Sequence, residues 1–482
     1  MGDAPSIQTV QQAIAPLRLL ADQAFSRTAG APLIPGNDIH LLKDAAENYP
    51  AWMDAIRAAG KTIDFETYFL RTDKIGYEFA ELLEAKAREG VRVRLIYDWF
   101  GARGTVSFRF WRALRKAGVD VRCFNPPRLD DPFESLRRDH RKTIVVDGRI
   151  GFVSGLCVGQ RWVGDAARGV EPWRDTGVKI EGPAVLDLGR AFARMWNSVT
   201  ASHLTQAEIL DESPIPPTGD VALRIVASEP SMAGLYRLDL LVAAVARTSM
   251  WLTDAYFLGT PSYVQSLRAA AFDGVDVRLL VPRTSDAPMI RALSRVGYRT
   301  LLESGVRIFE WNGAMLHAKT GVADGRWARV GSTNLNVASW MSNYELDVVV
   351  EDEAFAEAMR QMYLDDLEHS TEIVLSQGTK VRPRVRRKRE DLSPGSARGS
   401  AGRAAMGVLA IGNAVGAAVT TPRLLGPAEA PIMLVVASIL LCLVGLAIFL
   451  PFVVSILVAI FCGWGSATLF IKAFRLRFAG RK

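Results

Sequence analysis

Two stretches of the sequence share one pattern: His140-Arg141-Lys142-Thr143-Ile144-Val145-Val146-Asp147-Gly148 and His317-Ala318-Lys319-Thr320-Gly321-Val322-Ala323-Asp324-Gly325. Both read His-x-Lys-x4-Asp-Gly, in a chain with only five histidines. Because histidine and lysine two residues apart on a strand point to the same face, each stretch should present an imidazole and an ammonium group together. The Asp-Gly pair that follows the apolar run is typical of a type I′ hairpin turn.

The segments around the two motifs also recur in the same order. Three pairs of segments match: residues 62–70 with 250–258, 90–95 with 274–279, and 118–122 with 305–309. Each half alternates strand-like and helix-like segments, which indicates βαβ units. We therefore expect an α/β fold made by one long duplication, with two mostly parallel sheets that are flanked by helices and related by a pseudo-two-fold axis.

Composition and repeat order divide the 482 residues into six segments. They are an N-terminal helical segment (1–32), the first half (33–205), the second half (206–375), a basic linker with a small apolar segment (376–429), a membrane hairpin (430–471) and a basic tail (472–482). Residues 10–25 have the spacing of an amphipathic helix. We favour its packing on the body over its lying on a membrane. The N-terminus lacks the basic and apolar regions of a signal peptide.

The formal charge of +7 is unevenly distributed. Fifteen of the 58 basic residues and 3 of the 51 acidic residues lie between Lys380 and Lys482, so this part carries +12 and the rest carries −5. A nucleic-acid enzyme should carry its basic surface on the catalytic body. The distribution therefore argues against a nucleic-acid partner and favours an anionic membrane surface. The four cysteines form no CxxC pair, which argues against a disulfide framework and a zinc site.

The 42 residues from Ala430 to Ile471 contain no charged side chain. A bilayer is crossed by roughly 20 apolar residues, so the stretch is long enough for two transmembrane helices. Basic residues on both flanks favour two spans with both ends on the cytoplasmic side. The turn at Pro451 has no polar loop, so a re-entrant hairpin, or a homo-oligomer that covers the turn, stays open. A buried hairpin of a soluble protein is the less favoured reading.

Two such hairpins facing each other would form a pocket with two imidazoles and two ammonium groups. One neutral histidine can attack a phosphodiester phosphorus, and the other, when protonated, can protonate the leaving alkoxide. Lys142 and Lys319 can offset charge on the non-bridging oxygens, so we expect no metal and no other cofactor. Because the two histidines need opposite protonation states, their neighbours should separate their pKa values.

Carboxylates at related positions of the two halves are candidates to orient the histidines: Asp175 and Glu345. A carboxylate bonded to the far ring nitrogen fixes the tautomer of an imidazole. Asp147 and Asp324 complete the two motifs and count among the candidate catalytic residues, although an Asp-Gly turn explains them without chemistry.

Four further residues occupy matching strands of the two halves. Glu66 and Tyr68 correspond to Asp254 and Tyr256. The two carboxyl groups suit the lining of a site and hydrogen bonding at the edge of a core equally well. The three histidines outside the motifs have no such surroundings, and we expect them to be structural or on the surface.

The paired motifs resemble the signature of the phospholipase D superfamily, over residues 33–372. In that family the motif is followed by a Gly/Ser-rich turn and an asparagine, as in Gly331-Ser332-Thr333-Asn334. The resemblance implies that Ser332 and Asn334 donate to phosphate oxygens. It also implies that His140 attacks phosphorus and that His317 is the acid. The first half departs from the pattern, because Cys157 stands where the family has an asparagine.

Within this superfamily, three parts of the chain look like bacterial cardiolipin synthases: residues 65–69, the first motif and residues 254–257. This resemblance implies a multi-pass phosphatidyltransferase of the bacterial inner membrane with a cytoplasmic catalytic domain. It would convert two molecules of the anionic lipid phosphatidylglycerol into cardiolipin and glycerol. Known members often carry their spans at the N-terminus, whereas the apolar stretch here is C-terminal.

Three alternatives remain: a phospholipase D hydrolase, a phosphodiesterase or nuclease, and a membrane scaffold with an inert duplicated domain. The acidic body argues against the nuclease, and two intact motifs argue against the scaffold. The sequence does not separate transferase from hydrolase, because the choice of acceptor depends on the shape of the site and on the exclusion of water.

Overall fold

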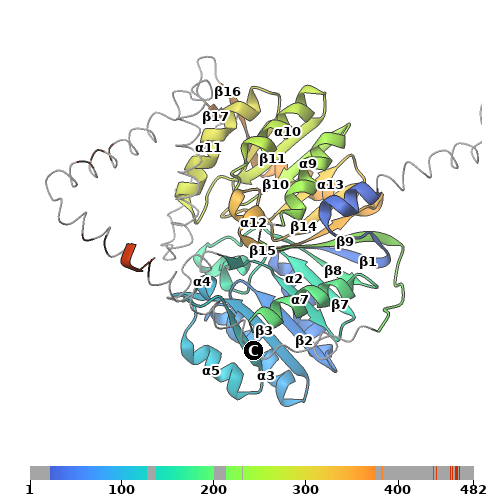
Figure 1. Ribbon diagram of the computed structural model, residues 1–482, viewed down its shortest axis with the longest axis vertical. Helices are drawn as coiled ribbons and strands as arrows, with labels where there is room; N and C mark the ends of the chain where they lie inside the picture. Colours follow the sequence, from blue (N-terminus) through green and yellow to red (C-terminus); the bar gives the residue numbers. More distant parts are fainter. Residues whose placement is uncertain are drawn as a thin grey trace, which may run out of the picture.

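The computed structural model describes residues 22–127, 137–199, 213–230, 232–375 and 381–383, and isolated positions between 438 and 466. Two halves with the same order of elements pack against each other, the first below the second in Figure 1. Each half is a sheet with helices on both faces.

The first sheet consists of seven strands. In spatial order they are β1 (Ile34–Lys43), β8 (Thr176–Glu181), β7 (Ile150–Ser154), β6 (Thr143–Val146), β2 (Thr62–Thr67), β3 (Arg92–Asp98) and β4 (Asp120–Phe124). Strands β2, β3 and β4 are parallel, and their connections contain α3 (Lys74–Arg88), α4 (Trp99–Ala102) and α5 (Phe108–Lys116). All other neighbours in this sheet are antiparallel.

The second sheet repeats this arrangement. Its order is β9 (Val221–Ser228), β15 (Asn343–Val350), β14 (Trp327–Gly331), β13 (Thr320–Ala323), β10 (Ser249–Thr253), β11 (Asp276–Pro282), β12 (Arg307–Trp311), β16 (Ser370–Leu375) and β17 (Val381–Pro383). Only β10, β11 and β12 are parallel, with α10 (Pro261–Phe272) and α11 (Pro288–Leu302) between them. Strand β1 also pairs with β9 and so joins the two sheets.

The expectation of mostly parallel sheets is wrong, because both sheets are mixed and most neighbouring strands are antiparallel. Helical crossovers produce parallel pairs within each sheet only among β2, β3 and β4 and among β10, β11 and β12. The motif strands β6 and β13 are followed by tight turns, and a two-residue turn can only join antiparallel strands.

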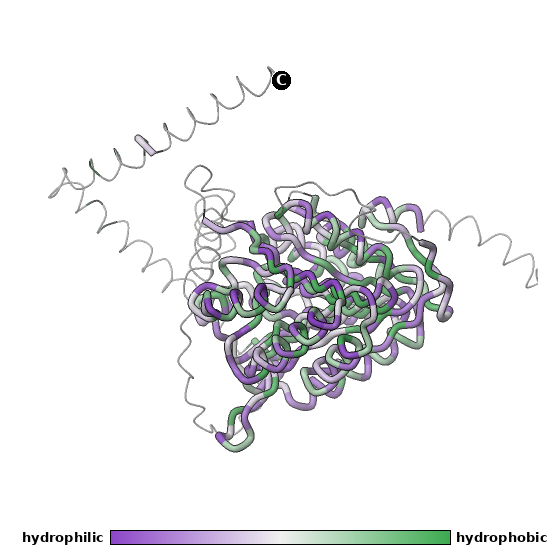
Figure 2. Tube along the Cα trace, turned by 90° about the horizontal axis from the view of Figure 1, so that it is seen from below, coloured by the Kyte–Doolittle hydropathy of each residue, from purple (hydrophilic) through white to green (hydrophobic). Residues whose placement is uncertain are grey.

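Within the described residues, four hydrophobic clusters hold the body together, and the three largest lie on the two outer faces and between the halves. Helices α2 (Asp44–Ala58), α3 and α5 cover the outer face of the first sheet, while α9 (Gly234–Val245), α10 and α11 cover that of the second. The third cluster lies between the halves, where α7 (Val185–Ser198) and α13 (Glu353–Glu368) pack with strands of both sheets. Figure 2 shows hydrophobic segments running through the interior of the body. This shared core fixes the two motifs relative to each other.

The two ends of the chain are described only in part. Residues 22–29 are helical, and Phe25 and Ala29 pack on the core of the second half, so this end of the predicted N-terminal helix lies on the body. The remainder of that helix lies outside the described residues. The same holds for most of the linker, the predicted membrane hairpin at 430–471 and the basic tail. Among the helices of the described residues, none is long and apolar enough to cross a membrane.

Candidate active site

Each motif begins where the chain pairs with the opposite half. Strand β5 (Arg138–Asp139) runs parallel to the start of β15, and the amide of His140 donates to the carbonyl of Tyr344 at 2.9 Å. In the second half, the amide of His317 donates to the carbonyl of Arg174 at 2.7 Å. Both acceptors directly precede a candidate orienting acid in the sequence. The backbone therefore sets each histidine next to an acid of the other half.

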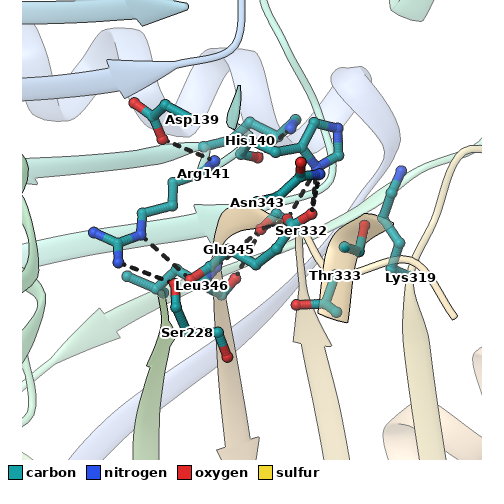
Figure 3. Close-up of polar contacts among 12 residues, drawn as sticks. Asp139, His140, Arg141, Ser228, Lys319, Ser332, Thr333, Asn343, Glu345 and Leu346 are labelled. Carbon is teal, nitrogen blue, oxygen red and sulfur yellow. Dashed lines mark hydrogen bonds and ion pairs between the residues drawn. The ribbon is translucent and has the colours of Figure 1, made fainter. Parts of the chain in front are cut away.

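The side chains complete this crossed arrangement. Nδ1 of His140 lies 2.9 and 3.1 Å from the carboxylate oxygens of Glu345, which comes from the second half (Figure 3). Nδ1 of His317 lies 2.7 Å from Oδ2 of Asp175, which comes from the first half. A carboxylate at Nδ1 holds the proton there and leaves Nε2 with its lone pair for chemistry. Both acids proposed from the sequence thus contact a motif histidine.

The two acids are themselves held by further donors. Glu345 accepts hydrogen bonds from Oγ of Ser332 at 2.6 Å and from the amide group of Asn343 at 3.1 Å (Figure 3). Asp175 accepts from the indole of Trp162 at 2.9 Å. Burial raises the pKa of both carboxyl groups, but the adjacent histidine, motif lysine and hydrogen-bond donor together outweigh it and bring the pKa of each below its usual value. Both acids are therefore anions.

The motif lysines lie beside their histidines and are buried. The ammonium groups of Lys142 and Lys319 each donate to the backbone carbonyl of the histidine two residues earlier. Nζ of Lys319 also lies 3.0 and 3.2 Å from the ring nitrogens of His317. Burial, with the charge of Lys142, lowers the pKa of Lys319 to about 8. Each lysine also lowers the pKa of the histidine in the other half, so the two motifs share one electrostatic site.

The expected separation of the histidine pKa values takes an unforeseen form. Burial lowers the pKa of both rings, and the Glu345 anion counteracts this at His140. At His317, burial and Lys319 together lower the pKa to about 4. Both imidazoles are therefore neutral at pH 7, rather than one neutral and one protonated.

Aromatic side chains surround the two histidines unequally. The rings of Tyr68 and His140 meet edge to face with centroids 5.2 Å apart, and Tyr256 lies 5.9 Å from His317 in the same manner. His317 is also flanked by Trp162 at 5.6 Å and by Trp173 at 5.7 Å. Sequence reasoning did not find the two tryptophans. Trp162 lies in α6 (Gln160–Val163), and Trp173 lies in the segment that follows it. The position of Trp173 two residues before Asp175 was the available signal.

The motif aspartates lie at the far end of the hairpins. Asp147 and Gly148 both have positive φ values, as do Asp324 and Gly325, which confirms the predicted type I′ turns. The carboxylate of Asp147 accepts from the amides of residues 60–62, and that of Asp324 accepts from the amides of residues 247–249. These contacts tie each turn to the start of the neighbouring strand.

Glu66 and Asp254 differ in their contacts. Glu66 lies within 3.3 Å of Oγ1 of Thr143 and 3.9 Å of the guanidinium of Arg141, behind the first motif. Asp254 accepts from the amides of Tyr256 at 3.0 Å and Leu335 at 2.8 Å. Asp254 therefore shapes the loop that carries Asn334, while Glu66 belongs to the core edge.

The loop after each motif shows how the halves have diverged. Ser332 directs its hydroxyl to Glu345, whereas the resemblance assigned it to phosphate. At the matching place in the first half a Cβ on Gly155 would lie 2.1 Å from Oδ1 of Asp175, so only glycine fits. Oδ1 of Asn334 is buried and accepts no hydrogen bond within the described residues, so this oxygen is available to a donor group of a substrate. Its counterpart Cys157 is a buried thiol.

Arg141, the middle residue of the first motif, has a positioning role that sequence reasoning missed. Its guanidinium is buried and donates to the backbone carbonyls of Glu345, Ala191 and Ser228 at 3.2–3.3 Å (Figure 3). Arg141 thus connects α7, β9 and β15 next to Glu345, the acid that holds His140. The counterpart in the second motif, Ala318, has no polar side chain.

Among the residues that the structure describes, no group of three or more histidine, cysteine, aspartate and glutamate side chains is arranged to hold a metal ion. The cations near the two imidazoles are Lys142 and Lys319. A reaction without metal therefore stays a prediction.

Comparisons with known proteins agree with this geometry. The family model described as "Cardiolipin synthase, PLD-like domain" matches residues 52–196 and 242–367, one segment in each half. The chain is 32% identical to the cardiolipin synthase of Alkalihalophilus pseudofirmus, over 72% of this chain and 69% of the relative. It is also 32% identical to cardiolipin synthase A of Pseudomonas fluorescens, over 75% and 74% of the respective chains.

A solved structure supports the fold alone. The phosphatidylserine synthase of Haemophilus influenzae superposes with a TM-score of 0.58 and 15% identity, over 73% of this chain and 91% of that protein. The family model, which matches the segments that contain both motifs, and the two relatives above show the family. The chain belongs to the phospholipase D-like cardiolipin synthase family and is an enzyme of the phospholipase D superfamily.

Proposed function

We propose that the protein transfers a phosphatidyl group from one phosphatidylglycerol molecule to a hydroxyl group of a second, forming cardiolipin and releasing glycerol. The observation that carries the proposal is the crossed pairing, in which His140 is held by Glu345 and His317 by Asp175. Two oriented imidazoles with two buried lysines supply a nucleophile, an acid and the counter-charge for a phosphodiester. The similarity to relatives named cardiolipin synthase supports the choice of lipid.

In the first step, Nε2 of His140 attacks phosphorus while Glu345 retains the proton on Nδ1. The bond between phosphorus and the glycerol oxygen breaks, and His317 gives that oxygen its proton. The products are free glycerol and a phosphatidyl group bonded to His140.

In the second step, a hydroxyl group of the second phosphatidylglycerol gives its proton to His317, which is now neutral. The oxygen bonds to phosphorus, and the bond between phosphorus and His140 breaks. Cardiolipin leaves, and both histidines return to their starting protonation states.

The resting protein has a neutral His317, so this ring must take up a proton from solvent when the substrate binds. Nζ of Lys319, now within 3.2 Å of both nitrogens of that ring, can turn to the phosphate oxygens. Loss of the adjacent ammonium and gain of an adjacent anion both raise the pKa of an imidazole. Substrate binding would thus charge the acid at the moment when it is needed.

The tryptophans beside His317 favour a lipid alcohol over water as the acceptor. Trp162 and Trp173 lie within 5.7 Å of the ring and cover it with apolar surface. An aromatic wall at the acid–base residue reduces the access of bulk water. We therefore favour a transferase over a hydrolase.

The test is to incubate the full-length protein with phosphatidylglycerol liposomes and to identify the products by mass spectrometry. We expect cardiolipin and glycerol in equal amounts, and none from His140→Ala or His317→Ala. Phosphatidic acid as the main product would replace the transferase with a hydrolase. Cardiolipin formation that survives either substitution would contradict the mechanism.

We further propose that the apolar stretch at 430–471 holds the protein in the bacterial inner membrane, with the body on the cytoplasmic side and self-association through that stretch. Its support is the absence of charged residues over 42 positions, flanked by basic residues. Full-length protein should sediment with membranes and resist carbonate extraction, whereas a chain ending at residue 379 should be extracted. Complete extraction of the full-length protein would contradict the anchor.

A further inference from the structure

The guanidinium group of Arg71 has one nitrogen, Nε, without a hydrogen-bonding partner among the described residues. Its backbone amide donates to the carbonyl of Val158 at 3.0 Å, and its side chain packs so closely on Gly159 that a Cβ there would lie 3.0 Å from Cδ. The guanidinium lies over the ring of Phe69 at 5.2 Å. Nε is buried and makes no hydrogen bond within the described part of the chain. A buried donor of this kind indicates a missing acceptor.

A second arginine, Arg161, follows two residues after Gly159, the residue on which Arg71 packs. Arg161, on α6, lies over the ring of Trp173 at 5.3 Å and is half-buried. Burial, followed by repulsion from Arg161, lowers the pKa of Arg71. Two like charges that repel each other in a partly buried place are unfavourable unless an anion offsets them.

The nearby carboxylates offset part of the charge of Arg71 but do not accept a hydrogen bond from its Nε. Asp73 accepts from the amides of Gly76 at 3.1 Å and Gln160 at 2.8 Å, as the cap of α3. Asp286 accepts from the hydroxyl of Tyr256 at 2.7 Å and lies 4.0 Å from Arg161, beyond hydrogen-bond distance. An anion that accepts from both guanidinium groups would satisfy Nε of Arg71 and offset the repulsion. Phosphate oxygens match the fork of arginine well.

Aromatic rings link both arginines to the surroundings of His317: Arg71 lies over Phe69, whose ring is 5.8 Å from that of Trp162, and Arg161 lies over Trp173. Trp173, which contacts Arg161, lies 5.7 Å from the ring of His317. Tyr256, which bonds to Asp286, lies 5.9 Å from the same ring. In the proposed reaction His317 serves first the leaving glycerol and then the acceptor hydroxyl. Both groups therefore occupy the surroundings of this ring.

The acceptor lipid brings a second phosphodiester, a few bonds away from its reacting hydroxyl. Lys142 and Lys319 are committed to the phosphate that reacts, so another anion needs other cations. We infer that Arg71 and Arg161 form a subsite for the phosphodiester of the acceptor lipid, and that this subsite makes the enzyme prefer a phospholipid acceptor to a neutral alcohol. The inference rests on the proposed function and names the residues that select its second substrate.

The test compares two acceptors for one donor. Full-length Arg71→Gln and Arg161→Gln proteins are given phosphatidylglycerol vesicles with isotope-labelled glycerol. Cardiolipin formation uses the anionic acceptor, while incorporation of labelled glycerol into phosphatidylglycerol uses a neutral one at the same catalytic centre. Because a hydrogen bond to a charged group contributes about 1.5–3 kcal/mol, cardiolipin formation should fall roughly 10- to 100-fold more than glycerol exchange in each variant. Arg168→Gln, an exposed arginine of the same loop, is the matched control and should leave the ratio of the two rates unchanged.

The outcomes separate the subsite from the proposed function. Equal loss of both rates would assign the arginines to folding or to donor binding and would overturn the subsite. An unchanged ratio in both variants would overturn it as well. Wild-type protein that exchanges glycerol but makes no cardiolipin would reject the proposed function, and the subsite with it. A lower ratio in the two variants, with the control unchanged, supports the inference.

Discussion

The two motif histidines have equivalent places in the two halves but different surroundings. His140 is held by a glutamate, faces one tyrosine and has its side chain 12% exposed. His317 is held by an aspartate, has two tryptophans and a tyrosine around it, and carries an ammonium group against its ring. A duplicated scaffold has thus kept the geometry of the pair and changed its environment. In the proposed mechanism, this difference suits one copy to attack on phosphorus and the other to proton transfer.

The largest expected effect comes from removing either histidine, and the leaving group should tell them apart. Loss of a nucleophile or of a general acid lowers turnover on the order of 10³-fold or more. A phosphatidyl donor with a p-nitrophenol leaving group needs no protonation. With it, His317→Ala should still form the phosphatidyl–enzyme, seen as added mass on the intact protein, and His140→Ala should form none. The reverse pattern would exchange the two roles.

The crossed pairing makes a second prediction about the acids. Glu345→Gln and Asp175→Asn should each lower cardiolipin formation roughly 10²- to 10⁴-fold, because each histidine loses its preferred tautomer. With the activated donor, formation of the phosphatidyl–enzyme should be restored in Asp175→Asn, which acts through His317, and should not be restored in Glu345→Gln, which acts through His140. Relief of Glu345→Gln instead would mean that each acid serves the histidine of its own half.

The motifs, their strands and their Asp-Gly turns could be predicted, because spacing along a strand fixes which side chains share a face. The partners of the acids could not. Which histidine Glu345 meets depends on how β15 packs beside β5, and no local pattern encodes contact between residues 205 positions apart. The mixed direction of the sheets was missed for a related reason, since alternation along a strand looks the same in parallel and antiparallel neighbours. The assignment of Ser332 to phosphate overlooked a nearer acceptor, Glu345.

A third prediction concerns the loops after the motifs. Asn334→Cys gives the second half the side chain of the first and should lower kcat/KM about 10-fold or more, if the amide donates to the phosphate as the family resemblance implies. The reciprocal Cys157→Asn should change kcat/KM by no more than about threefold but destabilise the fold by about 1–3 kcal/mol, since it buries an amide without partners. Steady-state kinetics and thermal unfolding measure both. A gain in activity in Cys157→Asn would show that the halves still share phosphate binding.

The fourth prediction uses pH. Lys319 has its pKa lowered to about 8 and is charged below that pH, so its loss of charge should make kcat/KM fall as the pH rises through 8. The acid limb should lie below the ordinary histidine value of 6.5, because burial lowers the pKa of His140. Lys319→Arg keeps its charge at high pH and should move the alkaline limb upward, relative to its own maximum. An alkaline limb that stays in place would remove Lys319 from this role.

The smallest effect is expected where the halves are alike. Asp147→Ala and Asp324→Ala each remove hydrogen bonds to backbone amides in a partly exposed turn, which should lower the free energy of unfolding by about 1–2 kcal/mol. Burial raises the pKa of both groups, but hydrogen bonds from backbone amides outweigh it, so each pKa is lowered. This stability is therefore present above the unfolded-state pKa near 4 and is lost as the pH falls below it. Urea unfolding at pH 7 and pH 3 measures the difference. A loss of activity in a variant that is fully folded would give the aspartates a catalytic part.

The exchange of carboxylates between the halves has a consequence for inheritance. Neither copy is self-sufficient, because the ring in each one is aimed by a residue that the other copy encodes. A substitution that shifts β15 would misdirect the imidazole of the N-terminal copy, although it lies some two hundred positions downstream. Such reciprocity removes the freedom that a duplication normally gives, namely to let one copy decay while its sister carries on.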